Sequence, residues 1–236
     1  MIYKGKNYGS DSSITYSNNN IYHLENLFPA EDNIYNLNQN LSKDDEKRIG
    51  IVKCEQSGKI IYGTGSLVGE NIVLTCAHII FDKKNIGKNI TFILKDEKNN
   101  LRKFAIINYF ISEAYLSDTN NVSEDYCILF LEKRLKNYGY FSLSFFDKDY
   151  LNSRYLYIKG FPYDEIINGN FQLISNSNCI DELDKDNKLL KYKSIETLSG
   201  QGGGPILKDN KICGIHCFND FKKGGIGIPL SPKIYG

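Results

Sequence analysis

Short runs of β-branched and aromatic residues follow one another along the chain from Arg48 onward, and Gly, Asn, Asp and Lys separate them. Examples are IGIVKC at 49–54, NITFILK at 89–95, YCILFLE at 126–132 and KICGIHC at 211–217. Short runs bounded by turn-forming residues are typical of strands, and stretches with the 3.6-residue period of a helix are scarce. The pattern therefore predicts an all-β protein, built as a barrel or a sandwich.

Two stretches are too polar for this pattern. Residues 1–47 contain the polar runs SNNN at 17–20 and SKDDEK at 42–47, which are typical of an N-terminal arm more than of a domain. Residues 176–188 are also mostly polar, and we expect them to form a loop.

Composition narrows the function classes. The chain has 236 residues, of which 41% are hydrophobic and 24% are charged, and these values are ordinary for a packed globular protein. The 29 basic and 28 acidic residues leave a net charge of +1, without the basic excess that nucleic-acid binding requires. Since no apolar run approaches the length of a membrane-spanning helix, we expect neither a nucleic-acid nor a membrane partner. The first residues show no apolar secretion signal, and the compartment stays unassigned.

The six cysteines are Cys54, Cys76, Cys127, Cys179, Cys213 and Cys217. No two of them form a CxxC pair, which argues against a structural zinc site. The chain is also long enough to fold without disulfide bonds. We therefore expect buried or free thiols in preference to a disulfide framework, and no metal or other cofactor.

The chain has only three histidines, His23, His78 and His216. His78 follows two apolar runs with a Gly-rich start, and a strand end is a rigid support for a general base. Asp125 opens another apolar run, where a carboxylate can orient such a histidine. Asp118 and Glu124 are alternative carboxylates for the same role. Further along, residues 199–206 form a Gly-rich turn, whose successive N–H groups can bind an oxyanion.

The order of histidine, aspartate and Gly-rich turn resembles the chymotrypsin-fold serine peptidases. The segments that carry the resemblance are GTGSLVG at 63–69, LTCAHI at 74–79, EDYCILFL at 124–131, GQGGGPI at 200–206 and CGIHC at 213–217. The chain is most similar to the V8-like glutamyl endopeptidases of that superfamily. The features of this branch are Gly160-Phe161-Pro162, Gly214-Ile215-His216, Thr197 five residues before the nucleophile position, and Gly9-Ser10-Asp11 near the N-terminus.

The resemblance implies a fold of two six-stranded antiparallel β-barrels with the site in the cleft between them. An N-terminal arm would span residues 1–47. The first barrel would span 48–140 and carry His78 and Asp125, and the second would span 141–236 and carry the Gly-rich turn and the substrate pocket. Relatives in this family are usually secreted and act on peptides or proteins.

The chain departs from the family at the nucleophile. The family motif reads Gly-x-Ser-Gly-Gly/Ser-Pro, whereas residues 200–205 read GQGGGP. The nucleophile position is therefore Gly202, which has no side chain. Ser199 lies about 10 Å upstream in an extended chain, too far to attack in its place. Since losing the nucleophile of a serine protease costs on the order of 10⁶ in turnover, we expect an inactive protein.

The substrate-binding parts of the family remain. By resemblance, the amides of Gly200 and Gly202 would form the oxyanion hole, and Thr197 and His216 would line the pocket for an acidic side chain. A hydroxyl and a protonated imidazole suit a carboxylate, because charge-assisted hydrogen bonds are about twice as strong as neutral ones. The implied partner is an acidic peptide or protein.

Three hypotheses follow from the sequence. The first is a serine-peptidase homologue that binds peptides without cutting them. The second is an active endopeptidase that cleaves after Glu or Asp, and the third is a structural or interaction module. No pattern in the sequence fixes an oligomeric state.

Overall fold

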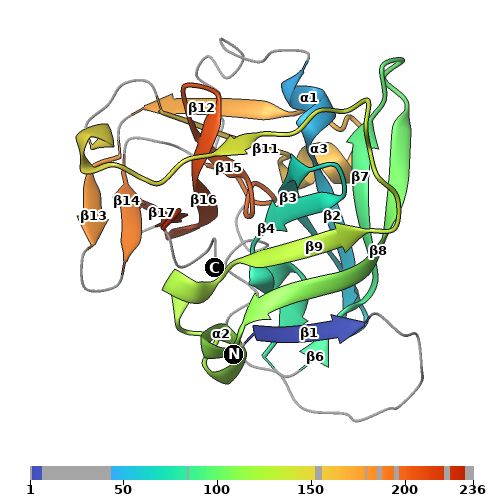
Figure 1. Ribbon diagram of the computed structural model, residues 1–236, viewed down its shortest axis with the longest axis horizontal. Coiled ribbons are helices and arrows are strands. Elements are labelled where there is room, and N and C mark those ends of the chain that lie inside the picture. The colour runs from blue at the N-terminus through green and yellow to red at the C-terminus, as the bar shows by residue number, and fades with distance from the viewer. Residues whose placement is uncertain are drawn as a thin grey trace.

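The computed structural model describes residues 2–6, 44–83, 85–151, 156–178, 180–184, 188–193, 197–220 and 224–231. Strands dominate these residues, and the helices among them are short (Figure 1). The helices are α1 (Asp45–Arg48), α2 (Glu113–Ser117) and α3 (Tyr163–Ile167), with 3-10 turns at Ala77–Ile79, Val122–Glu124 and Lys148–Tyr150. The prediction of an all-β protein is confirmed.

The first large sheet closes into a barrel. Its strands are β1 (Ile2–Lys6), β2 (Ile49–Gln56), β3 (Lys59–Gly69), β4 (Ile72–Thr75), β7 (Lys88–Lys95), β8 (Leu101–Ser112) and β9 (Cys127–Leu131). The strand order is β1-β8-β7-β2-β3-β4-β9, and an additional pairing of β8 with β9 closes six of these strands on themselves. Strand β1 pairs antiparallel with residues 108–112 of β8. A small separate hairpin joins β5 (Phe81–Asp82) to β6 (Asn85–Ile86).

The second large sheet contains the later strands. They are β10 (Ser142–Leu143), β11 (Leu156–Gly160), β12 (Ile174–Asn178), β13 (Glu182–Asp184), β14 (Leu189–Tyr192), β15 (Pro205–Lys208), β16 (Lys211–Asp220) and β17 (Gly224–Pro229). Their order is β12-β11-β15-β16-β17-β14-β13, and β10 pairs with β16. Together the two sheets give the two-barrel arrangement of the chymotrypsin fold, as the sequence predicts.

Two tight hairpins are explained by local chemistry. Ser57 (φ 49°) and Gly58 (φ 78°) connect β2 to β3, and Asp209 (φ 48°) and Asn210 (φ 60°) connect β15 to β16. Two-residue hairpins of type I′ need positive φ at both positions, which Gly, Asn and Asp adopt at low cost. The strands that carry the site are therefore placed in register by their own turns.

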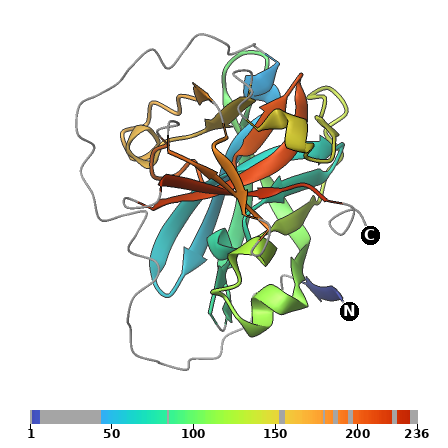
Figure 2. The ribbon, with the colours of Figure 1, turned by 90° about the vertical axis from the view of Figure 1, so that its left-hand side faces the viewer.

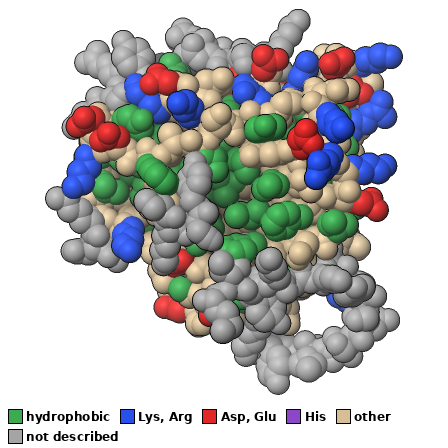
Figure 3. Space-filling model, in the orientation of Figure 1, with side chains coloured by type: hydrophobic (Ala, Val, Ile, Leu, Met, Phe, Trp, Pro, Cys, Tyr) green, Lys and Arg blue, Asp and Glu red, His purple; other side chains and the backbone are tan. Residues whose placement is uncertain are grey.

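The two sheets share a buried hydrophobic cluster, and a second cluster lies within the second sheet. One hydrophobic cluster contains Leu67 and Leu129 from the first sheet together with Ile215 and Ile228 from the second. Figure 1 and its 90° turn in Figure 2 show the later strands, orange to red, lying beside the earlier ones, blue to green. Figure 3 shows hydrophobic side chains across the middle of one face and charged side chains along its upper edge. Because the shared cluster is made of buried side chains from both sheets, the junction between the sheets is a buried surface.

The prediction of a loop over residues 176–188 is partly wrong. Strand β12 extends to Asn178, and Glu182–Asp184 form β13, which pairs with β14. Both strands lie at edges of the second sheet, where pairing with one neighbouring strand holds them. In β12 the buried Asn176 also accepts a hydrogen bond from Gln201 Nε2 at 3.0 Å. Residues 179 and 185–187 lie outside the described residues.

Of the expected arm, the structure describes residues 2–6 and 44–47. His23 and Gly9-Ser10-Asp11 therefore lie outside the described residues.

Candidate active site

His78 and Asp125 are brought together by the ends of two neighbouring strands. Strand β4 ends at Thr75, the 3-10 turn that follows carries His78, and Asp125 directly precedes β9. Because β4 pairs with β9, with Thr75 opposite Cys127, the two segments leave the sheet side by side. Local pairing of adjacent strands therefore fixes where both side chains lie.

The carboxylate of Asp125 holds the histidine at two points. The backbone N–H of His78 donates to Asp125 Oδ1 at 2.9 Å, and the ring Nδ1 lies 2.6 Å from Asp125 Oδ2. The Asp125 side chain is 4% exposed and that of His78 is 18% exposed. A buried carboxylate on Nδ1 orients the ring and favours the tautomer in which Nε2 can accept a proton, as a general base requires.

The two alternative carboxylates point elsewhere. Asp118 is exposed and accepts hydrogen bonds from Asn120. Glu124 is buried and accepts a hydrogen bond from the Ser112 hydroxyl at 2.7 Å. Of the three carboxylates, it is therefore Asp125 that the structure brings to His78.

The Gly-rich turn lies across both sheets and is held by backbone hydrogen bonds. The N–H of Thr64 in β3 donates to Gly202 O at 2.7 Å. The N–H of Gly203 donates to His216 O at 2.8 Å, and the N–H of His216 returns a hydrogen bond to Gly204 O at 2.8 Å. The turn therefore has a fixed position between β3 of the first barrel and β16 of the second sheet.

Two peptide groups in the turn have a set direction. The carbonyl of Ser199 accepts from Tyr163 N at 2.6 Å, and that of Gln201 accepts from Gly204 N at 2.9 Å. In a trans peptide the N–H points opposite to the C=O, so the amides of Gly200 and Gly202 point away from these anchors. Within the described part of the chain neither amide has an acceptor. Both N–H groups can therefore donate hydrogen bonds to an anion, as an oxyanion hole requires.

Three glycines of the turn are required by its geometry. Gly200 (φ +90°) and Gly203 (φ +83°) lie in the left-handed region. A Cβ on Gly203 would lie 2.2 Å from Thr64 O, and one on Gly204 would lie 2.2 Å from Lys159 O. The φ of Gly202, in contrast, is not positive. The backbone at the predicted nucleophile position is therefore compatible with an L-residue.

The two predicted pocket residues are both buried beside the turn. The Thr197 side chain ends in a buried Oγ1 without a hydrogen-bond partner in the described part of the structure. His216 is 1% exposed, and its Nδ1 hydrogen-bonds to the hydroxyl of Tyr192. Burial raises the pKa of Tyr192 well above its usual value, so the phenol keeps its proton. A phenol that donates to Nδ1 leaves the imidazole proton on Nε2, where it can be donated to a carboxylate.

Sequence reasoning missed residues that support the turn. The hydroxyl of Thr64 donates to Gly200 O at 2.9 Å and accepts from Phe161 N at 2.9 Å. Gln201 is fully buried and accepts from Leu198 N at 2.6 Å. A lone polar residue among glycines, in GTGS and in GQGGG, is the signal that could have found both. No comparable signal marks Tyr192.

Ser199 lies three residues before Gly202, at the start of the turn. Its Oγ is buried and has no hydrogen-bond partner in the described residues. The carbonyl of the same residue is held by Tyr163 N, which fixes the backbone there. The backbone that carries the Ser199 hydroxyl is therefore fixed in place on the Tyr163 side.

The cysteines are buried free thiols, as predicted, for the five that the structure describes. These are Cys54, Cys76, Cys127, Cys213 and Cys217, whereas Cys179 lies outside the described residues. Burial raises the pKa of Cys54 and of Cys213 to about 12. Thiols of this kind are protonated and unreactive at neutral pH.

Among the described residues, no helix has both the length and the hydropathy needed to cross a bilayer.

Comparison with known proteins supplies the family and the fold. The family model described as Trypsin matches residues 48–234. Similar solved structures include a Glu endopeptidase in complex with MPD, with 20% identity, a TM-score of 0.61, and coverage of 76% of this chain and 83% of that one.

Two further solved structures are similar to the chain. The thermostable serine protease AL20 from an extremophilic microorganism has 15% identity, a TM-score of 0.67, and coverage of 81% of this chain and 95% of that one. A scabies mite inactivated protease paralogue has 14% identity, a TM-score of 0.63, and coverage of 81% and 92%. No curated protein matches the chain.

Proposed function

Because the chain belongs to the trypsin family of serine proteases, whose model spans residues 48–234, we propose that it is a non-cleaving homologue that binds acidic peptides. The observation that carries the proposal is Gly202. It occupies the nucleophile position of a turn whose other glycines are required by the fold, and it offers no atom that could attack a carbonyl. Neither His78 nor Asp125 can substitute, because their roles are to accept and to orient a proton.

Two backbone amides of the turn support the proposal that the site still binds a ligand. The amides of Gly200 and Gly202 have no acceptor within the described part of the chain, and their peptides are anchored from the far side. An anionic oxygen, such as the C-terminal carboxylate of a cleaved peptide, could accept from both. No nucleophile is needed for this binding.

An acidic side chain would be recognised by Thr197 and His216. The buried Oγ1 of Thr197 has no partner in the described residues, and leaving a buried hydroxyl unsatisfied costs about 1–3 kcal/mol. A ligand carboxylate would remove that cost. The imidazole N–H of His216 would supply a second donor, and carboxylates form stronger hydrogen bonds than neutral acceptors do.

The active-endopeptidase alternative needs a serine that the turn does not supply. The nearest hydroxyl, that of Ser199, is buried and belongs to a backbone segment held by Tyr163. The low identity to the Glu endopeptidase, 20%, leaves the acidic preference as part of our proposal.

Thr197→Val tests the pocket. The substitution removes a buried hydroxyl without a partner, so we expect the free energy of unfolding to stay the same or to rise slightly. Affinity for a peptide ending in Glu, measured by calorimetry, should fall about tenfold or more, since a hydrogen bond to a charged group contributes about 1.5–3 kcal/mol. The same peptide ending in Gln should bind both proteins equally weakly.

Ser144→Ala is the matched control. Its hydroxyl is also buried without a partner, but the residue follows β10, away from the turn. We expect it to leave peptide affinity unchanged. If Thr197→Val binds the Glu peptide as tightly as the unmodified chain does, the acidic pocket is excluded.

A further inference from the structure

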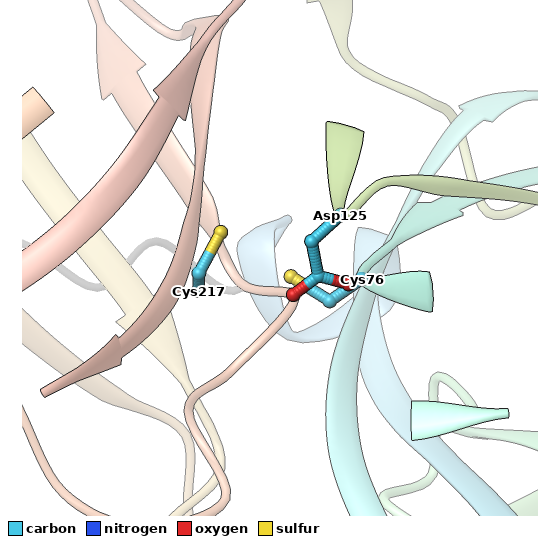
Figure 4. Close-up of side chains that lie close together, drawn as sticks. All are labelled: Cys76, Asp125 and Cys217. Carbon is cyan, nitrogen blue, oxygen red and sulfur yellow. The ribbon is translucent and has the colours of Figure 1, made fainter. Parts of the chain in front are cut away.

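Three buried donor groups converge at the junction of the two barrels. Cys76 follows β4, Asp125 precedes β9, and Cys217 lies in β16 of the second sheet. Their relative exposures are 0%, 3% and 0%. Figure 4 shows Cys76 and Asp125 on one side of the gap between the sheets and Cys217 on the other. The two thiols and a carboxylate oxygen all lie within 4.8 Å of one another.

These donors suit a thiophilic cation. Zn²⁺ binds thiolate sulfur at about 2.3 Å and carboxylate oxygen at about 2.0–2.2 Å, which places tetrahedral donors about 3.5–3.8 Å apart. The observed separations are within about an ångström of that arrangement, so small rotations of the two cysteine side chains would close the site. Paired sulfur ligands favour Zn²⁺ and related soft ions over Mg²⁺ or Ca²⁺.

The surroundings would favour a positive charge at this point. The thiol of Cys76 lies 3.4 Å from His216 O and within hydrogen-bonding reach of Cys217 and His78. The buried carboxylate of Asp125 adds a negative charge. A bound dication would release the thiol protons to solvent as sulfur–metal bonds form.

We propose that Cys76, Cys217 and Asp125 form a buried binding site for a thiophilic divalent cation, represented by Zn²⁺. Each oxygen of Asp125 has two lone pairs, so the carboxylate can coordinate while it still accepts from His78. Occupancy is therefore coupled to the orientation of His78. The site does not depend on peptide binding.

The spacing of these residues along the chain explains why sequence patterns gave no sign of the site. Zinc motifs are recognised by ligands a few residues apart, whereas these three ligands come from separate segments of two sheets. Packing of the sheets alone brings them together.

Cobalt titration tests the proposal on the reduced, metal-free chain. We expect one equivalent of Co²⁺ to bind with a thiolate-to-cobalt charge-transfer band, and Zn²⁺ to displace it. Cys76→Ala and Cys217→Ala should each abolish the band and weaken binding about tenfold or more. Cys213→Ala is the matched control, because this buried thiol donates to Ile206 O outside the cluster, and it should bind Co²⁺ like the unmodified chain.

A second measurement does not depend on the variants folding. The ¹¹³Cd NMR signal of the Cd²⁺-loaded chain should lie in the range of sites with two sulfur ligands. A signal in the range of oxygen ligands alone, no metal uptake, or unchanged binding in the Cys76→Ala/Cys217→Ala double variant would each overturn the proposal. So would finding the two sulfurs joined in a disulfide in the purified reduced protein.

Discussion

At the scale of single residues, the glycines of the turn separate into two kinds. Gly203 combines a φ of +83° with a Cβ position 2.2 Å from Thr64 O and 2.3 Å from Thr75 Oγ1. Gly202, one residue earlier, does not have positive φ. Steric necessity therefore explains Gly203 and leaves Gly202 without a conformational reason. The φ of Gly202 alone would therefore allow an L-residue at that position.

Alanine substitutions at the two positions should have unequal effects. Gly203→Ala forces a Cβ into backbone and side-chain atoms at positive φ, and we expect it to lower the free energy of unfolding by about 3 kcal/mol or more. Gly202→Ala should change it by no more than about 1 kcal/mol. Urea unfolding of both variants measures the difference, and equal destabilisation would show that the turn needs glycine at both positions.

Local motifs single out the candidate site residues more readily than they reveal the contacts between them. His78 and the Gly-rich turn stand in local motifs that position them, and Asp125 was favoured over two rivals by its place before an apolar strand. The hydrogen bond between Tyr192 and His216 could not be predicted, because it joins two separate strands at buried positions. Only the register of the second sheet brings those side chains together.

At the scale of elements, a buried ion pair joins α1 to β11. Lys159 Nζ lies 2.8 Å from Asp45 Oδ2, with side chains 6% and 4% exposed. The backbone of Lys159 also packs against the turn, since a Cβ on Gly204 would lie 2.2 Å from its carbonyl oxygen. The same strand thus supports the turn and connects it to the start of the first barrel.

Lys159→Met should be strongly destabilising. Asp45 would lose the hydrogen bond from Lys159 Nζ and keep its ion pair with Arg48, 3.1 Å away. Because Arg48 still compensates part of that charge, we expect the free energy of unfolding to fall by about 2 kcal/mol or more. Lys95→Met is the matched control, because Lys95 pairs with Glu46 at the surface and should cost less than about 1 kcal/mol. Similar values for both variants in urea unfolding would argue against the role of the buried pair.

Strands with apolar periodicity were predictable, and polar edge strands were not. The alternation in β9 buries Cys127, Leu129 and Leu131, which is the pattern of a strand with one face on the core. Strand β13 has no such pattern and is held by pairing with β14. At an edge, the partner strand decides the structure more than the side chains do.

At the scale of the whole molecule, the site exists only where the two sheets meet. The first barrel supplies His78, Asp125 and the Thr64 contacts, and the second sheet supplies the turn and His216. The family resemblance implies such a division, because its motifs stand in the same order along the chain. It could not predict the cluster of Cys76, Asp125 and Cys217, which depends on how these particular sheets pack.

Under the proposed function, the hydroxyl of a serine at position 202 is what separates this arrangement from an active one. The orienting carboxylate, the histidine and the two anion-directed amides are in place around a backbone that can accept an L-residue at position 202. A serine introduced there should therefore meet a site that is otherwise assembled. Removing His78 in the same background should then lower turnover on the order of 10⁴-fold or more.

The most direct measurement compares hydrolysis of a Glu-containing fluorogenic peptide by the unmodified chain, by Gly202→Ser and by Gly202→Ser/His78→Ala. We predict that only Gly202→Ser cleaves the peptide. Cleavage by the unmodified chain that depends on His78, or no cleavage by Gly202→Ser, would contradict the account.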